Sequence, residues 1–231
     1  MELSDIAKKM CAKGKGILAA DESTGTIAKR FKSINVENIE SNRLIFRQTL
    51  FNSSGMKDYI GGVILFDETI RQKTTLGLSV PELISKNGAI TGIKVDKGAK
   101  PLAGSLEETI TEGLDGLRDR LKEYYELGAR FTKWRAVYKI GNSFPSSQSI
   151  KANAHALARY AAVVQESKMV PIVEPEVLMN GSHNIKKCYD VTTNVLHECY
   201  NELNLYKIDL KGTVLKPNMI IPGSDCKDQS S

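Results

Sequence analysis

Apolar stretches that end in charged residues recur six times along the chain. They cover residues 16–22, 62–68, 92–97, 131–135, 170–176 and 213–217. Runs of four to eight apolar residues bounded by turn-forming residues are typical of buried strands. We therefore predict six strands, each of which ends where charged residues begin.

Most stretches between these strands have the spacing of helices. One predicted helix starts with a capping box at Ser105 and Glu108 and ends before Gly128. Its apolar positions recur every three or four residues, at Leu114, Leu117, Leu121 and Tyr125. Further helices are predicted over about residues 37–52, 149–167 and 185–203.

Strands that alternate with helices indicate parallel β–α–β units, in either an open sheet or a closed barrel. The turn after the first strand, residues 21–26, contains one glycine and lacks the glycine-rich motifs of nucleotide-binding sheets. A parallel (β/α)8 TIM-barrel type of α/β fold is therefore favoured. The strand starts lie about 39 residues apart, so 231 residues hold about six of the eight units. We predict one incomplete barrel domain over residues 1–231.

Composition narrows the class of protein. Hydrophobic residues make up 41% of the chain and charged residues 26%, which excludes a disordered, collagen-like or disulfide-stapled protein. The formal net charge of +5 is too small to indicate nucleic-acid binding, although it suits an anionic small substrate.

The cysteines and the first residues indicate a compartment. Four cysteines show no metal-type spacing, and residues 1–9 lack the apolar region of a signal peptide. The chain also has no apolar run long enough to cross a membrane. We expect a cytoplasmic protein with free thiols rather than the alternative, a secreted protein with two disulfides.

Charged residues are repeated at the ends of the predicted strands, where residues i and i+2 share a face. The charged pairs at this spacing are Lys94 with Asp96, Lys133 with Arg135, and Glu174 with Glu176. On the last strand, Lys216 shares a face with Val214 and Asn218. One such residue would be an ordinary polar residue at a strand end, but their repetition favours a site in the mouth of a barrel.

The residue types in this set indicate a reaction. A lysine amine loses its proton more readily when other positive charges lie close to it or when it is buried away from water. A neutral amine attacks carbonyl groups and forms a Schiff base, while neighbouring carboxylates transfer protons. Arginine can hold a phosphate. The set therefore predicts metal-free cleavage or formation of a carbon–carbon bond in a phosphorylated ketose.

A metal-dependent aldolase is the alternative, and it would need histidines clustered at strand ends. His155, His183 and His197 fall instead on predicted helices or a loop. We expect His155 and His183 to lie at a helix surface or to cap a helix.

Over nearly its whole length the sequence resembles class I fructose-bisphosphate aldolase, the Schiff-base type. Three stretches carry most of this resemblance: Gly128-Ala-Arg-Phe-Thr-Lys-Trp-Arg135, Val170-Pro-Ile-Val-Glu-Pro-Glu176 and Leu215-Lys-Pro-Asn-Met219. Shorter matches occur over residues 16–24, 61–66 and 92–98.

The resemblance implies catalytic roles for five residues. Lys216 would be the Schiff-base lysine, Glu174 the main acid/base residue, and Glu176 its neighbour during iminium formation. Lys133 would assist carbinolamine chemistry, and Asp21 would handle the proton of the C4 hydroxyl. The implied contacts to substrate or its phosphates are Lys94, Arg135, Arg30, Arg43 and Ser23.

The implied reaction is reversible cleavage of fructose 1,6-bisphosphate to dihydroxyacetone phosphate and glyceraldehyde 3-phosphate, without metal or other cofactor. The resemblance also implies a homotetramer, with no nucleic-acid or membrane partner. Relatives of this kind continue through two more strand–helix units that carry further phosphate contacts. Two alternatives stay open: a non-catalytic fragment that acts at most as a binding or scaffold protein, and another lysine-type aldolase.

Overall fold

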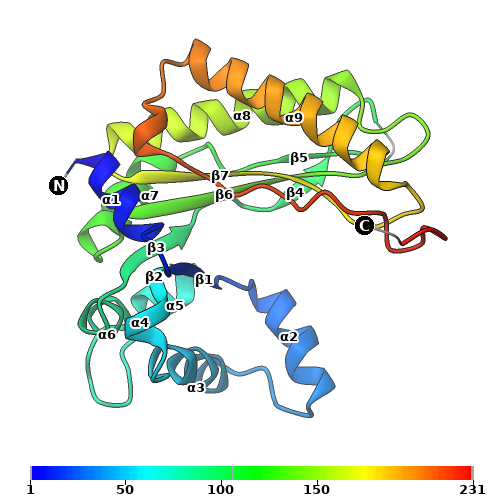
Figure 1. Cartoon of the computed structure of the whole chain (residues 1–231). Helices are drawn as coiled ribbons and strands as arrows, with labels where there is room; N and C mark the ends of the chain where they lie inside the picture. Colours follow the sequence, from blue (N-terminus) through cyan, green and yellow to red (C-terminus); the bar gives the residue numbers. More distant parts are fainter. Residues whose placement is uncertain (1, 106, 230–231) are drawn as a thin grey trace. The chain divides into compact units, whose positions relative to one another are not determined.

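The computed structural model describes residues 2–105 and 107–229, and its chain divides into two compact units (Figure 1). The first unit comprises Met1–Lys94, Arg118–Lys133 and Ser167–Val170. The second comprises Val95–Leu117, Trp134–Glu166 and Pro171–Ser231. The expectation of a single domain over residues 1–231 stays a prediction, and each unit is described by itself.

Parallel strands form the centre of the first unit. They are β1 (Gly16–Ala20), β2 (Ile60–Leu65), β3 (Ile90–Lys94) and the first residues of β6 (Phe131–Tyr138), hydrogen-bonded in that order. The fully buried ring of Phe131 crosses the neighbouring strands at two glycines. A Cβ atom on Gly92 would come within 2.2 Å of this ring, so the close approach requires glycine there.

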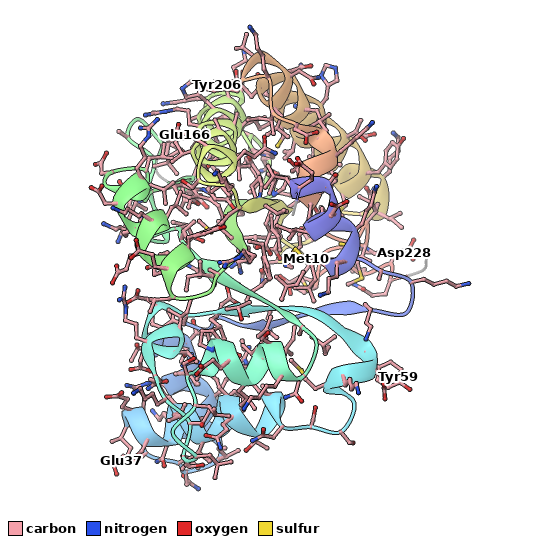
Figure 2. The ribbon with its side chains drawn as sticks, turned by 90° about the vertical axis from the view of Figure 1, so that its left-hand side faces the viewer. Met10, Glu37, Tyr59, Glu166, Tyr206 and Asp228 are labelled. Atoms are coloured by element: carbon pink, nitrogen blue, oxygen red, sulfur yellow. The ribbon has the colours of Figure 1, made fainter. Side chains whose placement is uncertain are left out.

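Helices surround these strands in the first unit (Figure 1). They are α1 (Leu3–Met10), α2 (Thr24–Ser33), α3 (Glu40–Phe51), α4 (Met56–Tyr59), α5 (Asp67–Arg71), α6 (Val80–Lys86) and α7 (Leu117–Glu126). Figure 2 shows Tyr59 at the outer end of α4 and Glu37 in the turn between α2 and α3. Met10, at the end of α1, is fully buried, because the backbone of α1 packs closely on Gly61.

The second unit contains the rest of β6 together with β7 (Val170–Val177) and β8 (Val214–Leu215), and β7 and β8 pair in parallel. Two long helices, α8 (Ser147–Glu166) and α9 (Ile185–Leu205), lie side by side along β6 and β7 (Figure 1). Their carboxyl ends, marked by Glu166 and Tyr206 in Figure 2, lie at the same end of the unit. A short 3₁₀ helix, η1 (Leu210–Gly212), leads into β8.

All six predicted strands are confirmed, but β6 does not end at its charged residues, since it continues past Arg135 to Tyr138. Among the described residues they form one six-stranded sheet in the order β1-β2-β3-β6-β7-β8. The predicted helices over about residues 37–52, 149–167 and 185–203 correspond to α3, α8 and α9. The helices α1, α2, α4, α5 and α6 were not predicted, since they fall in short stretches without a sustained apolar period.

The predicted helix start at Ser105 and Glu108 is wrong. Ser105 does donate a hydrogen bond to the Glu108 carboxylate, at 3.1 Å, but the next residues form β5 (Thr109–Thr111), which pairs antiparallel with β4 (Ala99–Pro101). Glu108 also accepts hydrogen bonds from the backbone and hydroxyl of Ser146, at 2.7 and 2.6 Å. This tertiary contact and the β-branched threonines that follow favour a strand, and α7 starts later, at Leu117. Position 106 of the motif lies outside the described residues.

Candidate active site

The pairing of β7 with β8 brings Glu174 and Lys216 together in the second unit. Ile172 and Val173 pair with Val214 and Leu215, and the backbone N–H of Lys216 continues the ladder to Val173 at 2.9 Å. Glu174 and Lys216 are therefore the next residues in register on neighbouring strands. Their side chains form an ion pair in which Lys216 Nζ donates to Glu174 Oε1.

The two members of this pair differ in their access to solvent. The side chain of Glu174 is 3% exposed, whereas that of Lys216 is 47% exposed. A buried carboxylate that contacts a reachable amine can take a proton from that amine and return it to a bound molecule. The geometry therefore suits an amine nucleophile with a fixed proton acceptor beside it.

Asn218 anchors the chain directly after Lys216. Its Oδ1 accepts a hydrogen bond from the backbone N–H of Val177 at 3.1 Å, and its Nδ2 donates to Thr192 Oγ1 at 3.1 Å. These contacts tie the segment after β8 to both β7 and α9. Sequence alternation placed Asn218 on the face of Lys216, but the anchoring contacts were not predicted.

A second ion pair in the same unit joins Arg135, on β6, to Glu176, on β7, through Arg135 Nε and Glu176 Oε2. The side chains are 42% and 27% exposed, so both can reach a molecule in solution. Asp96 accepts a long hydrogen bond from the backbone N–H of Arg135, at 3.4 Å, and another from Gly98 at 3.0 Å. Asp96 therefore holds backbone, which its spacing from Lys94 did not reveal.

The first unit contains the ion pair between Lys133 and Asp21, with 2.6 Å between Nζ and Oδ2. Asp21 directly follows β1, and Lys133 lies on β6 in register with Lys94, the last residue of β3. The side chains of Lys133 and Asp21 are only 8% and 9% exposed. Their charges therefore neutralise each other in a largely buried position.

Buried arginines support the loop that contains Asp21. Arg43 forms a bidentate ion pair with Glu68, in which Nε donates to Oε1 at 2.8 Å and Nη2 donates to Oε2 at 2.5 Å. Arg47 is fully buried, and its Nη2 donates to the backbone carbonyl of Glu22 at 2.7 Å. The hydrogen bonds from Arg43 lower the pKa of Glu68 below its usual value, while burial lowers the pKa of Arg47.

Arg47, Glu68 and Glu22 were not predicted as part of a site. Glu68 could have been considered as a site residue, because the charged residues 67–68 end the second apolar run in the same way as the other candidates. Their partners could not be recognised, because the contacting residues are about 25 positions away in sequence.

Two predicted phosphate contacts already have local partners. Ser23 caps α2, since its hydroxyl oxygen accepts a hydrogen bond from the backbone N–H of Thr26 at 3.3 Å. Arg30, on α2, forms an ion pair with Glu22 and is 57% exposed. The exposed guanidinium of Arg30 remains available to an anion, and the roles of Ser23 and Arg30 stay predictions.

The histidines do not gather at strand ends. His155 lies on the surface of α8 and contacts Glu202 of α9 at 3.1 Å, as expected for a helix-surface residue. The expectation that His183 lies at a helix surface or caps a helix is wrong: it is buried, and Asn184 caps α9. Within residues 2–105 and 107–229, no three His, Cys, Asp or Glu side chains are grouped to hold a metal ion.

The structure shows the state of the cysteines and the character of the helices. Cys11, Cys188, Cys199 and Cys226 all carry free thiols, as predicted. Across the described part of the chain, no helix combines the length and the apolar character needed to span a bilayer.

A family model described as fructose-bisphosphate aldolase class-I matches residues 2–231. The chain belongs to the class I fructose-bisphosphate aldolase family. A probable class 1 aldolase of Xylella fastidiosa (strain Temecula1) is 56% identical over 230 residues, which are the whole of this chain and 69% of that protein. The cytosolic fructose-bisphosphate aldolase 5 of Arabidopsis thaliana is 60% identical, over 97% of this chain and 63% of its own length.

Solved structures of aldolases share this fold. The fructose-bisphosphate aldolase of Plasmodium falciparum, solved with TRAP and a small-molecule inhibitor, matches with a TM-score of 0.97 and 45% identity. The match covers 99% of this chain and 67% of that one. The parallel β/α arrangement is therefore that of an aldolase, consistent with a partial TIM barrel.

Proposed function

We propose that this chain represents a metal-independent aldolase that reversibly cleaves fructose 1,6-bisphosphate through a Schiff base on Lys216. The products are dihydroxyacetone phosphate and glyceraldehyde 3-phosphate. The observation that carries the proposal is the half-exposed amine of Lys216 in contact with the buried carboxylate of Glu174. Membership of the aldolase family supports it.

The first half of the reaction forms the iminium. The amine of Lys216 gives a proton to Glu174 and attacks the C2 carbonyl carbon of the ketose, which forms a carbinolamine. Glu174 then returns a proton to the C2 hydroxyl, which leaves as water. Glu176, two residues further along β7, assists this step and is itself oriented by Arg135.

The second half breaks the bond between C3 and C4. A base removes the proton from the C4 hydroxyl, the aldehyde leaves, and the bonding electrons enter the iminium to give an enamine. We assign this base to Asp21, whose carboxylate is held by Lys133 at 2.6 Å. Protonation at C3 and hydrolysis by water then release dihydroxyacetone phosphate and restore Lys216. Lys133 also assists the carbinolamine step in this proposal.

Phosphate recognition is assigned to basic residues at the strand ends and nearby helices. Arg135 is the leading contact, because its guanidinium is 42% exposed and its ion pair with Glu176 runs through Nε. Lys94, Arg30 and Ser23 are proposed as further contacts. Arg43 is also proposed, although its bond to Glu68 favours an indirect role in orienting the site.

We also propose that the protein works in the cytoplasm as a homotetramer, without nucleic-acid or membrane partners. The name of the Arabidopsis thaliana relative, which describes that protein as cytosolic, supports the location. The family resemblance supports the tetramer.

The proposal is tested by a cleavage assay on the 231-residue chain, with a chelator present and triose phosphates measured as products. We expect cleavage of fructose 1,6-bisphosphate at a rate that the chelator leaves unchanged. Substrate binding without cleavage by the folded chain would favour the non-catalytic alternative. Equal turnover of a non-phosphorylated sugar would favour another lysine-type aldolase.

A further inference from the structure

A polar cavity of about 420 Å³ lies in the second unit, and none of its lining residues is assigned to catalysis. It is lined by residues 140–142, which follow β6, by residues 182–184, and by Lys187 in the first turn of α9. The lining contains a lysine and a histidine but no acidic residue. Its charge therefore favours an anion.

His183 is the unusual member of this lining. It is 9% exposed, and neither of its ring nitrogens has a hydrogen-bond partner within residues 2–105 and 107–229. Buried polar atoms are almost always hydrogen-bonded, so two such nitrogens on one ring indicate a missing partner. Burial also lowers the pKa of His183.

The position of His183 is fixed by close backbone packing. Gly223 donates a hydrogen bond to the carbonyl of His183 at 2.8 Å, and Asp225 donates to the carbonyl of Gly181 at 2.9 Å. A Cβ atom on Gly223 would lie 2.1 Å from the Gly181 carbonyl oxygen and 3.0 Å from His183 Cε1. The backbone at His183 is therefore held in place before any ligand binds, which reduces the entropy lost on binding.

The positive charge of the cavity comes from the N-terminus of α9 and from Lys187. The N-terminus of α9, a helix of 21 residues, carries the partial positive charge of its first backbone N–H groups, of which that of Lys187 already donates to Asn184 Oδ1 at 2.8 Å. Lys187 is exposed, and its ammonium makes no ion pair within the described part of the chain. Its neighbour Lys186 does make one, with Asp190 at 3.0 Å.

We propose that this cavity binds a small molecule through a phosphate group, contacted by His183, Lys187 and the N-terminus of α9. A helix N-terminus with an adjacent cationic side chain is a recurrent phosphate site. The cavity is larger than a phosphate ion, so it also has room for the organic part of a phosphorylated metabolite. None of these residues belongs to the proposed aldolase machinery.

The test is a titration of the whole chain with inorganic phosphate, followed by NMR of the histidine ring signals at constant ionic strength. His183→Gln assigns the signal of His183, while His155 and His197 on the helices serve as internal controls. We expect the His183 signal to move saturably with phosphate and the other two signals to stay in place. Acetate, used as a carboxylate probe, should bind more weakly.

Lys187→Met should weaken phosphate binding about tenfold, as expected for the loss of one charge-assisted hydrogen bond. Lys186→Met, which removes the same charge one residue away, is the matched control and should leave the affinity unchanged. If the His183 signal did not move when phosphate is added, the proposal would be overturned. Equal affinity losses in the two variants, or binding of acetate as tight as that of phosphate, would also overturn it.

Discussion

Each unit of the molecule contains a lysine–carboxylate pair made by residues of the candidate site, and the two pairs differ in burial. In the first unit, both Lys133 and Asp21 are almost completely covered. In the second, Glu174 is covered but 47% of the Lys216 side chain is exposed. Of these two lysines, Lys216 alone offers an amine that an incoming carbonyl can reach, which distinguishes a nucleophile from a fixed charge of the same residue type.

The surroundings of the first pair are also more buried than those of the second. Asp21 adjoins Glu22, which is held by the buried Arg47, and this rigid network makes the first pair part of the packed interior. The second pair depends on the register of β7 with β8 and on Asn218. Charge in the first unit should therefore matter for both stability and catalysis, and charge in the second mainly for catalysis.

The largest effect is expected from Lys216→Arg. Arginine keeps the positive charge beside Glu174 but cannot form a Schiff base, so cleavage should fall by at least about 10⁴-fold, as for other lost nucleophiles. The melting temperature should stay close to that of the unchanged chain, because solvent reaches this side chain. Cleavage within tenfold of the original rate would remove Lys216 from the role of nucleophile.

The next effect compares the stability cost of losing each lysine. Lys133→Met leaves Asp21 as a buried charge and should lower the free energy of unfolding by about 3 kcal/mol. Lys216→Met also leaves a covered carboxylate, that of Glu174, but solvent reaches the position of the half-exposed ammonium and can hydrogen-bond Glu174 Oε1. We therefore expect a smaller cost, about 1 kcal/mol. Urea unfolding of the two variants measures the difference, and equal losses would show that burial does not separate the pairs.

Proton transfer distinguishes the two glutamates of β7. Glu174→Gln keeps the shape of the side chain but removes the proton acceptor, so kcat should fall by about 10²–10³-fold with little change in KM. Glu176→Gln, the matched control, should lower kcat less because Glu176 assists only one step. A rise in KM alone for Glu174→Gln would identify Glu174 as a binding residue.

The smallest effect is a pH dependence in the first unit. Hydrogen bonds from Arg43 lower the pKa of Glu68 in the folded state, so the folded protein binds a proton there less readily than the unfolded chain. The resulting stability is present above the pKa of the unfolded state, about 4.3, and is lost as pH falls through the folded value.

Glu68→Gln tests this contribution. The difference in unfolding free energy between the original chain and the variant should be about 1–2 kcal/mol near neutral pH and should shrink below about pH 4. A difference that is constant from pH 7 to acid would show that ionisation of Glu68 contributes no stability.

Local patterns were enough to predict the strands and the long helices. Glu174 and Glu176 lie in the last half of β7 and Lys216 directly follows β8, which is why they could be recognised as candidates. In β6 the charged residues Lys133 and Arg135 lie within the strand, which continues to Tyr138. The wrong helix start at Ser105 arose because a local pattern did not decide the structure there. A local capping motif was overridden by the contact between Glu108 and Ser146, which are 38 residues apart.

Burial and long-range pairing could not be predicted. Lys133 and Lys216 look alike in sequence, since each lies at the end of an apolar run, yet their exposures are 8% and 47%. The buried position of His183 depends on Gly223, which is 40 residues further along the chain. Such differences arise from packing between segments that are distant in sequence.

The central claim is that the exposed lysine is the nucleophile and the buried lysine is not. The most direct measurement is borohydride reduction in the presence of dihydroxyacetone phosphate, followed by digestion and mass mapping of the modified peptide. Reduction of the iminium leaves a stable secondary amine, and we predict it on Lys216 with none on Lys133 or Lys94. An adduct on Lys133, or a folded chain with no adduct at Lys216, would contradict the account.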